Sequence, residues 1–261
     1  MPDEVRISRE GHLFIVTINR PAAHNALTPA MHQALADAFD IFAGDPELWV
    51  AILTGAGDKA FCAGSDLKII ATEGLILEAP WNGGYGGLVA RFDLDKPVIA
   101  AVNGAALGGG FEIALACDLI IAAEHAKFGL PEPRVGLAAI AGGLHRLPRQ
   151  IGLKKAMGLI LSGESVDARE GERLGFVNEV CPTGGVLDTA RRWAEKIMLG
   201  SPMAVRASKE AVGRGLAEPS VKQALARQAA YPSMLNMLQS ADFIEGPKAY
   251  AAKMPPVWVG K

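Results

Sequence analysis

The sequence has no excess of positive charge, because its 26 Lys and Arg residues are outnumbered by 28 Asp and Glu residues, for a net charge of −2. Proteins that bind nucleic acids generally carry clustered Lys and Arg residues that neutralise phosphates. The chain as a whole does not have that balance, although the count leaves room for a local basic patch. We therefore predict no nucleic-acid partner.

Cysteines are also few, and no two are spaced as Cys-x-x-Cys. The three residues are Cys62, Cys117 and Cys181, an odd number that favours small buried thiols over a disulfide framework. The first ten residues lack the apolar run of a secretory signal. These features predict a reducing compartment, the cytoplasm.

An unbroken apolar stretch long enough for a membrane helix is missing as well. The longest candidate, residues 97–117, is interrupted by Asn103, Glu112 and three consecutive glycines. We predict no membrane span.

Three common catalytic motifs are absent: the Walker A loop, Gly-x-Ser-x-Gly, and His spacing suited to a metal ion. The sequence thus predicts no metal site. A dinucleotide-type run, GAGDKA at 55–60, continues into FCAG and not into a helical pattern. We interpret it as a glycine-rich turn.

Half of the residues are hydrophobic, and the apolar runs in the first part of the chain are short and continuous, as in strands covered on both faces. They predict strands at 13–18, 49–53, 98–102 and 119–122, with a weaker one at 176–180. Thr28 and Pro29 predict the start of a helix that Gly44 closes. Strands alternating with helices indicate an α/β fold.

The last part of the chain is helical in pattern, with predicted helices at 186–199, 202–212 and 221–238. A change in composition near Gly200-Ser201-Pro202 marks the best internal boundary. We predict an α/β core that carries the site over residues 1–200, followed by a helical region over 201–261.

Three segments carry the chemistry: KAFCAGSDLK at 59–68, NGAALGGGFE at 103–112 and FGLPE at 128–132. In the second, a predicted strand ends in glycines and a helix begins. Free N–H groups at such a helix start stabilise negative charge, and glycines let a ligand approach closely. Tight packing of helix against strand would use the same glycines, so this segment alone leaves both interpretations open.

Two carboxylates lie in apolar surroundings. Glu112 falls in the first turn of an apolar helix, and Glu132 follows Pro131 near Phe128 and Leu130. Such groups are seldom buried without a function or a partner. A pair in one cleft suits general acid–base catalysis with separated pKa values, whereas a helix-terminal charge or a buried ion pair is the structural alternative.

The three segments resemble the enoyl-CoA hydratase/isomerase (crotonase) superfamily, most specifically KPVIAAVNG at 96–104 with the glycine run and Glu112. The similarity extends from Asn25-Ala26-Leu27 to the C-terminal helices. EGPKAY at 245–250 and PVW at 256–258 resemble the carnitinyl-CoA dehydratase branch. The resemblance implies a spiral of ββα units, a C-terminal helical region that builds a homotrimer or a dimer of trimers, and acyl-CoA substrates with no separate cofactor.

The resemblance also implies residue roles. The N–H groups of Ser65 and Gly109 would form an oxyanion hole, and Glu112 and Glu132 would match the two catalytic glutamates. The substrate would also border a further set of residues: Ala63, Asp66, Leu67, Lys68 and Lys253, with Lys68, Lys59 and Lys253 near the coenzyme A phosphates. Each of these lysines is as readily explained as an exposed, solvated side chain.

The expected reaction is reversible addition of water to a 2-enoyl-CoA through an enolate. Glu112 would deprotonate the water and Glu132 would deliver the α-proton. The alternatives are carnitinyl-CoA dehydration, Δ3,Δ2-isomerisation by one carboxylate, and a non-catalytic acyl-CoA-binding relative. Ile140 stands where related hydratases carry a glycine-rich Pro-Gly-Ala stretch near the water, and residues 81–87 fall where the family shapes its acyl pocket.

Overall fold

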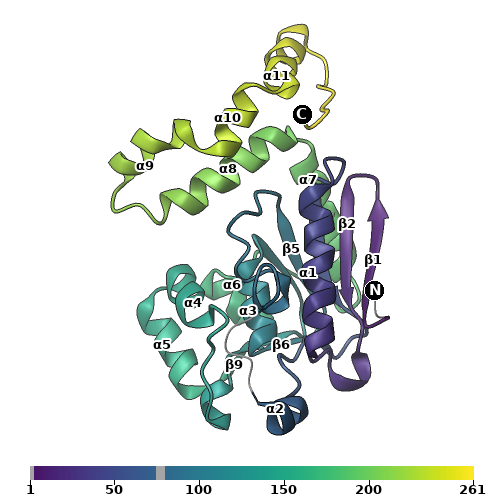
Figure 1. Cartoon of the computed structure of the whole chain (residues 1–261), viewed down its shortest axis with the longest axis vertical. Helices are drawn as coiled ribbons and strands as arrows, with labels where there is room; N and C mark the ends of the chain where they lie inside the picture. Colours follow the sequence, from purple (N-terminus) through teal and green to yellow (C-terminus); the bar gives the residue numbers. More distant parts are fainter. Residues whose placement is uncertain (1–2, 75–79) are drawn as a thin grey trace.

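Two sheets organise the chain in the computed structural model, which describes residues 3–74 and 80–261 (Figure 1). The larger sheet contains, in spatial order, β1 (Val5–Glu10), β2 (Leu13–Ile18), β3 (Val50–Gly55), β5 (Val98–Val102), β7 (Leu119–Ala123) and β10 (Glu179–Cys181). The smaller sheet contains β4 (Ala60–Cys62), β6 (Ala105–Leu107), β8 (Lys127–Gly129) and β9 (Ser165–Asp167). Neighbouring strands are parallel except for the pairs β1–β2 and β8–β9.

The chain alternates between the two sheets. A strand of the larger sheet is followed by a short strand of the smaller sheet and then a helix: β3, β4 and α2 (Leu67–Glu73), then β5, β6 and α3 (Gly109–Ala116). In the third unit β7 and β8 lead into a short 3-10 helix, η3 (Glu132–Val135), and then α4 (Gly143–Ile151). This is the expected spiral of ββα units.

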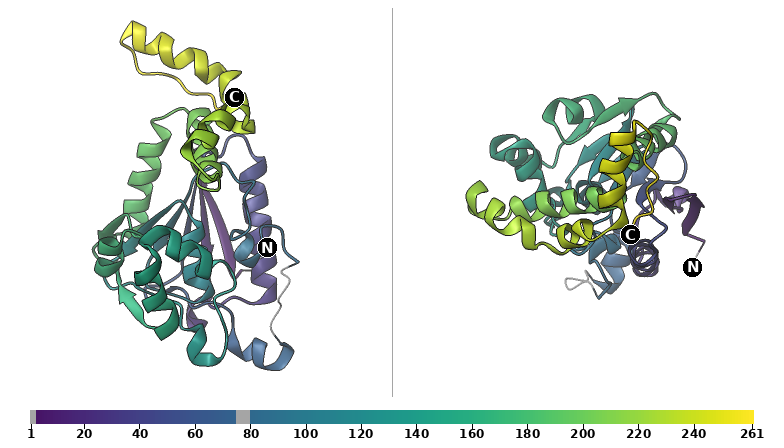
Figure 2. Two further views of the ribbon diagram at one scale, coloured as in Figure 1. Left: turned by 90° about the vertical axis from the view of Figure 1, so that its left-hand side faces the viewer. Right: turned by 90° about the horizontal axis from the view of Figure 1, so that it is seen from above.

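The strands β2, β3, β5 and β7 of the larger sheet are buried on both faces, which explains why they are continuously apolar, whereas the edge strand β1 is mostly exposed. Helix α1 (Pro29–Gly44) covers one face, and α7 (Val186–Met198) packs on β3, β5 and β7 from the other (Figure 2). The Thr28 hydroxyl accepts a hydrogen bond from the N–H of Met31, so α1 begins where the Thr-Pro pair predicts.

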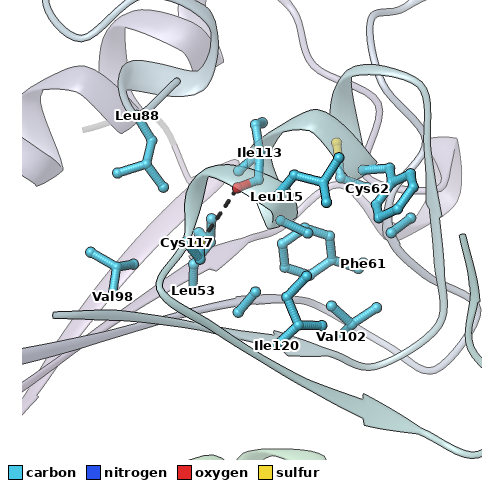
Figure 3. Packing of buried hydrophobic residues seen from close by; sticks show 14 of the residues in the cluster. Leu53, Phe61, Cys62, Leu88, Val98, Val102, Ile113, Leu115, Cys117 and Ile120 are labelled. Carbon is cyan, nitrogen blue, oxygen red and sulfur yellow. Dashed lines mark hydrogen bonds between the residues drawn. The ribbon is translucent and has the colours of Figure 1, made fainter. Parts of the chain in front are cut away.

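Helix α3 is fixed by an apolar core beneath it (Figure 3). Phe61 and Cys62 of β4 lie against its inner face, and strands of the larger sheet fill the space below. A Cβ atom added at Gly110 would fall 2.0 Å from the carbonyl oxygen of Cys62. The backbones of α3 and β4 therefore touch directly, and the start of α3 has a fixed position relative to the chain after β4.

Two sequence predictions need correction. The helix predicted over 221–238 is broken into α9 (Val221–Arg227), a 3-10 turn η4 (Gln228–Ala230) and α10 (Pro232–Leu238). The cause is Pro232, which holds the preceding Tyr231 in an extended conformation with ψ 139. The strand predicted over 176–180 begins only at Glu179, because the N–H groups of Phe176 and Val177 donate to the Gly171 carbonyl of the preceding helix.

The remaining helices are α5 (Leu153–Ser162), α6 (Ala168–Leu174), α8 (Pro202–Gly215), α11 (Ala241–Ala252) and the 3-10 turns η1 (Pro21–Ala23) and η2 (Tyr85–Gly87). Helices α8 to α11 extend away from the sheets at one end of the molecule (Figures 1 and 2). The division at residue 200 falls between α7 and α8 and stays a prediction. Within the described ranges, no helix combines the length and apolar character needed to cross a bilayer.

Candidate active site

The three segments singled out from the sequence meet at one edge of the smaller sheet. Strands β4, β6 and β8 lie side by side and are parallel, so the chain leaves all of them on the same side. That edge, the carboxyl ends of parallel strands, is where α/β proteins bind ligands. Ser65, Gly109, Glu112 and Glu132 follow these strands and line one cavity of about 240 Å³.

Two backbone N–H groups at this edge have no acceptor. The loop after β4 is held to residue 27, which donates to the Gly64 carbonyl and accepts from the N–H of Asp66, and this pattern bypasses the Ser65 N–H. Gly109 opens α3, where N–H groups have no intrahelical acceptor. Neither N–H has a hydrogen-bond acceptor within residues 3–74 and 80–261. Both residues line the cavity and present donors for a ligand.

The Glu112 carboxyl group is buried in the first turn of α3, with 3% of the residue exposed. Burial, with a smaller contribution from the nearby Glu132 carboxylate, raises its pKa to about 7 against the opposing effect of a hydrogen bond from Gly143. The Gly143 N–H donates to Glu112 Oε1 at 2.8 Å. The segment that contains Ile140 thus leads directly into the amide that orients Glu112.

The Glu132 carboxyl group opens η3 on the opposite loop. Its Oε2 atom is buried and has no hydrogen-bond partner among the residues that the structure describes. Burial raises the pKa of Glu132 as well. In the described part of the chain neither glutamate forms an ion pair, so the alternative of a buried salt bridge does not account for them. Two carboxyl groups of raised pKa therefore line the same space.

Aromatic side chains line the cavity beside Ser65 and Gly109, and the sequence did not predict them as part of the catalytic site. The Tyr85 hydroxyl lies 2.9 Å from the Ser65 hydroxyl. A Cβ atom added at Gly109 would fall 2.3 Å from the Tyr85 oxygen. His32 of α1 packs against Tyr85 and stacks on Trp81 with ring centroids 4.3 Å apart. The family resemblance assigns residues 81–87 to the acyl pocket. His32 lies among the apolar positions of α1, where no local pattern distinguishes it.

The predicted substrate-binding residues divide into two groups. Those that line the cavity are Ala63, Ser65, Asp66, Leu67 and Gly109. Asp66 also caps α2 and pairs with Arg20 at 2.7 Å.

The second group consists of Lys59, Lys68 and Lys253, which are not among the lining residues. Lys253 caps the end of α11, and that helix lies at the far end of the molecule from α2 (Figure 1). Among residues 3–74 and 80–261, no three His, Cys, Asp or Glu side chains are grouped to hold a metal ion.

A ββα spiral that carries such a cavity at the edge of its smaller sheet defines a protein of the crotonase fold. The match to a crystal structure of an enoyl-CoA hydratase from Mycobacterium marinum has a TM-score of 0.91 and 42% identity over 99% of each chain. A carnitinyl-CoA hydratase structure from Mycobacterium avium matches over 100% of each chain, with a TM-score of 0.78 and 42% identity.

Sequence comparison agrees with the fold. The family model for enoyl-CoA hydratase/isomerase matches residues 8–261. A carnitinyl-CoA dehydratase from Salmonella enteritidis PT4 is 42% identical over 100% of both chains. The chain belongs to the enoyl-CoA hydratase/isomerase family.

Proposed function

We propose that this protein catalyses the reversible addition of water to a 2-enoyl-CoA thioester. The observation that carries the proposal is the meeting of two backbone N–H groups without an acceptor in the described residues and two carboxyl groups of raised pKa, one buried and one half-buried, in one cavity. Water addition needs both kinds of group, one for the thioester oxygen and one for the protons.

The N–H groups of Ser65 and Gly109 would hold the thioester oxygen. Addition of water to the β-carbon moves an electron pair onto this oxygen and forms an enolate. Fixed donors aimed at such an oxygen stabilise the transition state without reorganising, and loss of one donor typically costs 10²–10³ in rate. Coenzyme A enters as part of the substrate, and the proposed reaction needs no other cofactor.

Glu112 would act as the base and Glu132 as the acid during hydration. Glu112, held by the Gly143 N–H, takes a proton from water while the water oxygen bonds to the β-carbon. Glu132, whose Oε2 has no partner among the described residues, delivers a proton to the α-carbon of the enolate. A pKa near 7 at Glu112 lets it serve as base at neutral pH and return the proton in the reverse reaction.

Dehydration of a β-hydroxyacyl-CoA such as carnitinyl-CoA is the same reaction in reverse. The full-length identity of 42% to a carnitinyl-CoA dehydratase favours this substrate as a second candidate.

The cavity residues Ala63, Asp66 and Leu67 would border the acyl-CoA, with Lys68 on the exposed side of α2 near its phosphates. Because α11 lies at the far end of the subunit, a phosphate contact from Lys253 would require a second copy of the chain. A homotrimer, or a dimer of trimers, in the cytoplasm is the setting that we propose for it.

An assay with crotonyl-CoA tests the reaction. We expect the absorbance of the conjugated thioester to fall as water adds, with hydroxybutyryl-CoA as product. A rise in absorbance from a 3-enoyl-CoA, with no hydration, would instead indicate an isomerase. No turnover on a broad panel of acyl-CoA thioesters, with binding retained, would indicate a non-catalytic relative.

A further inference from the structure

The imidazole of His32 is fixed as a hydrogen-bond donor. The backbone N–H of Gly86 donates to His32 Nδ1 at 3.0 Å, so this nitrogen carries a lone pair and the ring proton sits on Nε2. Burial lowers the pKa of His32 to about 4, which keeps the ring neutral at physiological pH. The tautomer is therefore set by the backbone.

The position of the ring is also fixed. Trp81 stacks on it and Tyr85 meets it edge-on, with ring centroids 4.3 and 4.4 Å away. Only 4% of His32 is exposed, yet the residue lines the cavity. No described residue accepts a hydrogen bond from Nε2. The ring is buried and held in place, and its donor faces the cavity without a partner among the described residues.

A second donor lies in the same wall. The hydroxyl groups of Tyr85 and Ser65 share one hydrogen bond at 2.9 Å, and one of their two hydrogens is enough to make it. The other hydrogen is left for a further acceptor. The wall formed by His32, Trp81, Tyr85 and Ser65, here called the donor wall, therefore offers two polar hydrogens to the cavity.

In the described part of the chain no residue across the cavity accepts a hydrogen bond from these donors, and the unpartnered Oε2 of Glu132 makes none with them. Leu27, Ile70, Leu137 and Ile140 supply apolar lining, and the Asp66 carboxylate is already engaged by Arg20 and the N–H of Lys68. Burial accounts for the low pKa of His32. Polar groups in a largely buried wall are normally paired, and a ligand with an acceptor would complete these donors.

We propose that the acyl group of the substrate carries an oxygen acceptor, a hydroxyl or a carbonyl, beyond its reacting double bond, and that His32 selects it through Nε2–H. This inference rests on the proposed function, because the Ser65 and Gly109 N–H groups are taken to hold the thioester oxygen. The chain oxygen is thus a different atom from the thioester oxygen. A plain alkyl chain would leave the donors unpaired, and a quaternary ammonium group offers no acceptor for them.

Matched substrates test the inference. The probes are 2-heptenoyl-CoA, its counterparts with a keto oxygen on the fifth or sixth carbon, where it is not conjugated with the reacting double bond, and a 2-butenoyl-CoA with a trimethylammonium group on its last carbon. Affinity from calorimetric titration is measured beside kcat/KM. We expect one of the keto substrates to exceed the alkyl substrate at least about tenfold in both quantities.

Two substitutions of His32 distinguish recognition of the chain oxygen by Nε2–H from a purely structural role of the ring. His32→Asn retains an acceptor near Nδ1 for Gly86 but has no donor at the Nε2 position. His32→Gln places a donor near Nε2 but gives up the Nδ1 acceptor. We expect His32→Asn to reduce the keto-to-alkyl ratio to about one, and His32→Gln to keep most of that ratio even where both rates fall.

The outcomes are distinct. Equal affinity for keto and alkyl chains, preference for the trimethylammonium chain, or an unchanged ratio in His32→Asn would overturn the inference. Selective binding of a keto substrate without any hydration would support the donor wall and refute the proposed reaction. Failure of every acyl-CoA to bind would refute both.

Discussion

Replacing Glu112 by Gln is expected to lower kcat about 10²- to 10⁴-fold and to leave acyl-CoA affinity nearly unchanged. Gln has almost the same shape and can still accept the Gly143 hydrogen bond, but it cannot take a proton from water. Glu132→Gln is expected to have an effect of the same order, because it removes the donor of the α-proton. Single-turnover kinetics and calorimetric affinity measure the two quantities separately.

Glu195→Gln is the matched control, since Glu195 is exposed on α7 and far in sequence from the cavity segments. It should retain the kcat of the unmodified protein. Full activity in both Glu112→Gln and Glu132→Gln would contradict the assignment of the two carboxyl groups as acid and base.

The Glu112 substitution is also expected to stabilise the fold, in a pH-dependent way. The folded pKa of about 7 lies above the ordinary value of 4.5, so the folded chain binds more protons than the unfolded chain between these values. Stability therefore declines as pH rises from about 4.5 to about 7. Glu112→Gln removes the charge and should therefore raise the free energy of unfolding by about 3 kcal/mol at pH 8 and by little at pH 4. Denaturant unfolding at the two pH values measures it.

Replacing Gly110 by Ala is expected to damage both stability and turnover. The added methyl group would fall 2.0 Å from the Cys62 carbonyl oxygen, a backbone atom that cannot rotate away. Helix α3 and β4 must separate, which we expect to cost about 2–3 kcal/mol. The same shift would move the Gly109 N–H relative to the Ser65 N–H and lower kcat/KM about 10²-fold.

Gly158→Ala is the control for that change. Gly158 lies in α5 with open space where its Cβ would be, so the substitution should stabilise the protein by about 0.5–1 kcal/mol and leave turnover intact. Unfolding by denaturant and the crotonyl-CoA assay compare the two variants. Normal stability and activity in Gly110→Ala would show that the contact between α3 and β4 does not set the site.

Around the candidate active site, the sequence predicted those elements that depend on a few neighbouring residues. Thr28-Pro29 marked the start of α1, the apolar run at 98–102 matched β5, and Glu112 fell in the first turn of α3. These features depend on a few neighbouring residues. The convergence of the three loops came from the family resemblance, since the strands that align them, β4, β6 and β8, are three residues long and show no periodicity.

Contacts between distant segments were not predictable. Tyr85 meets Ser65 across 20 positions, Gly143 orients Glu112 across 31, and Gly86 fixes the His32 tautomer across 54. None of these pairs has a local pattern. The break in the helix at Pro232 is different, because the proline was visible in the sequence and a periodic apolar pattern outweighed it.

A crystal structure with a bound, unreactive acyl-CoA analogue tests the central claim most directly. The account predicts the thioester oxygen within hydrogen-bond distance of both the Ser65 and the Gly109 N–H groups, with the α- and β-carbons between Glu112 and Glu132. A thioester oxygen bound elsewhere, or an acyl chain that contacts neither glutamate, would contradict it.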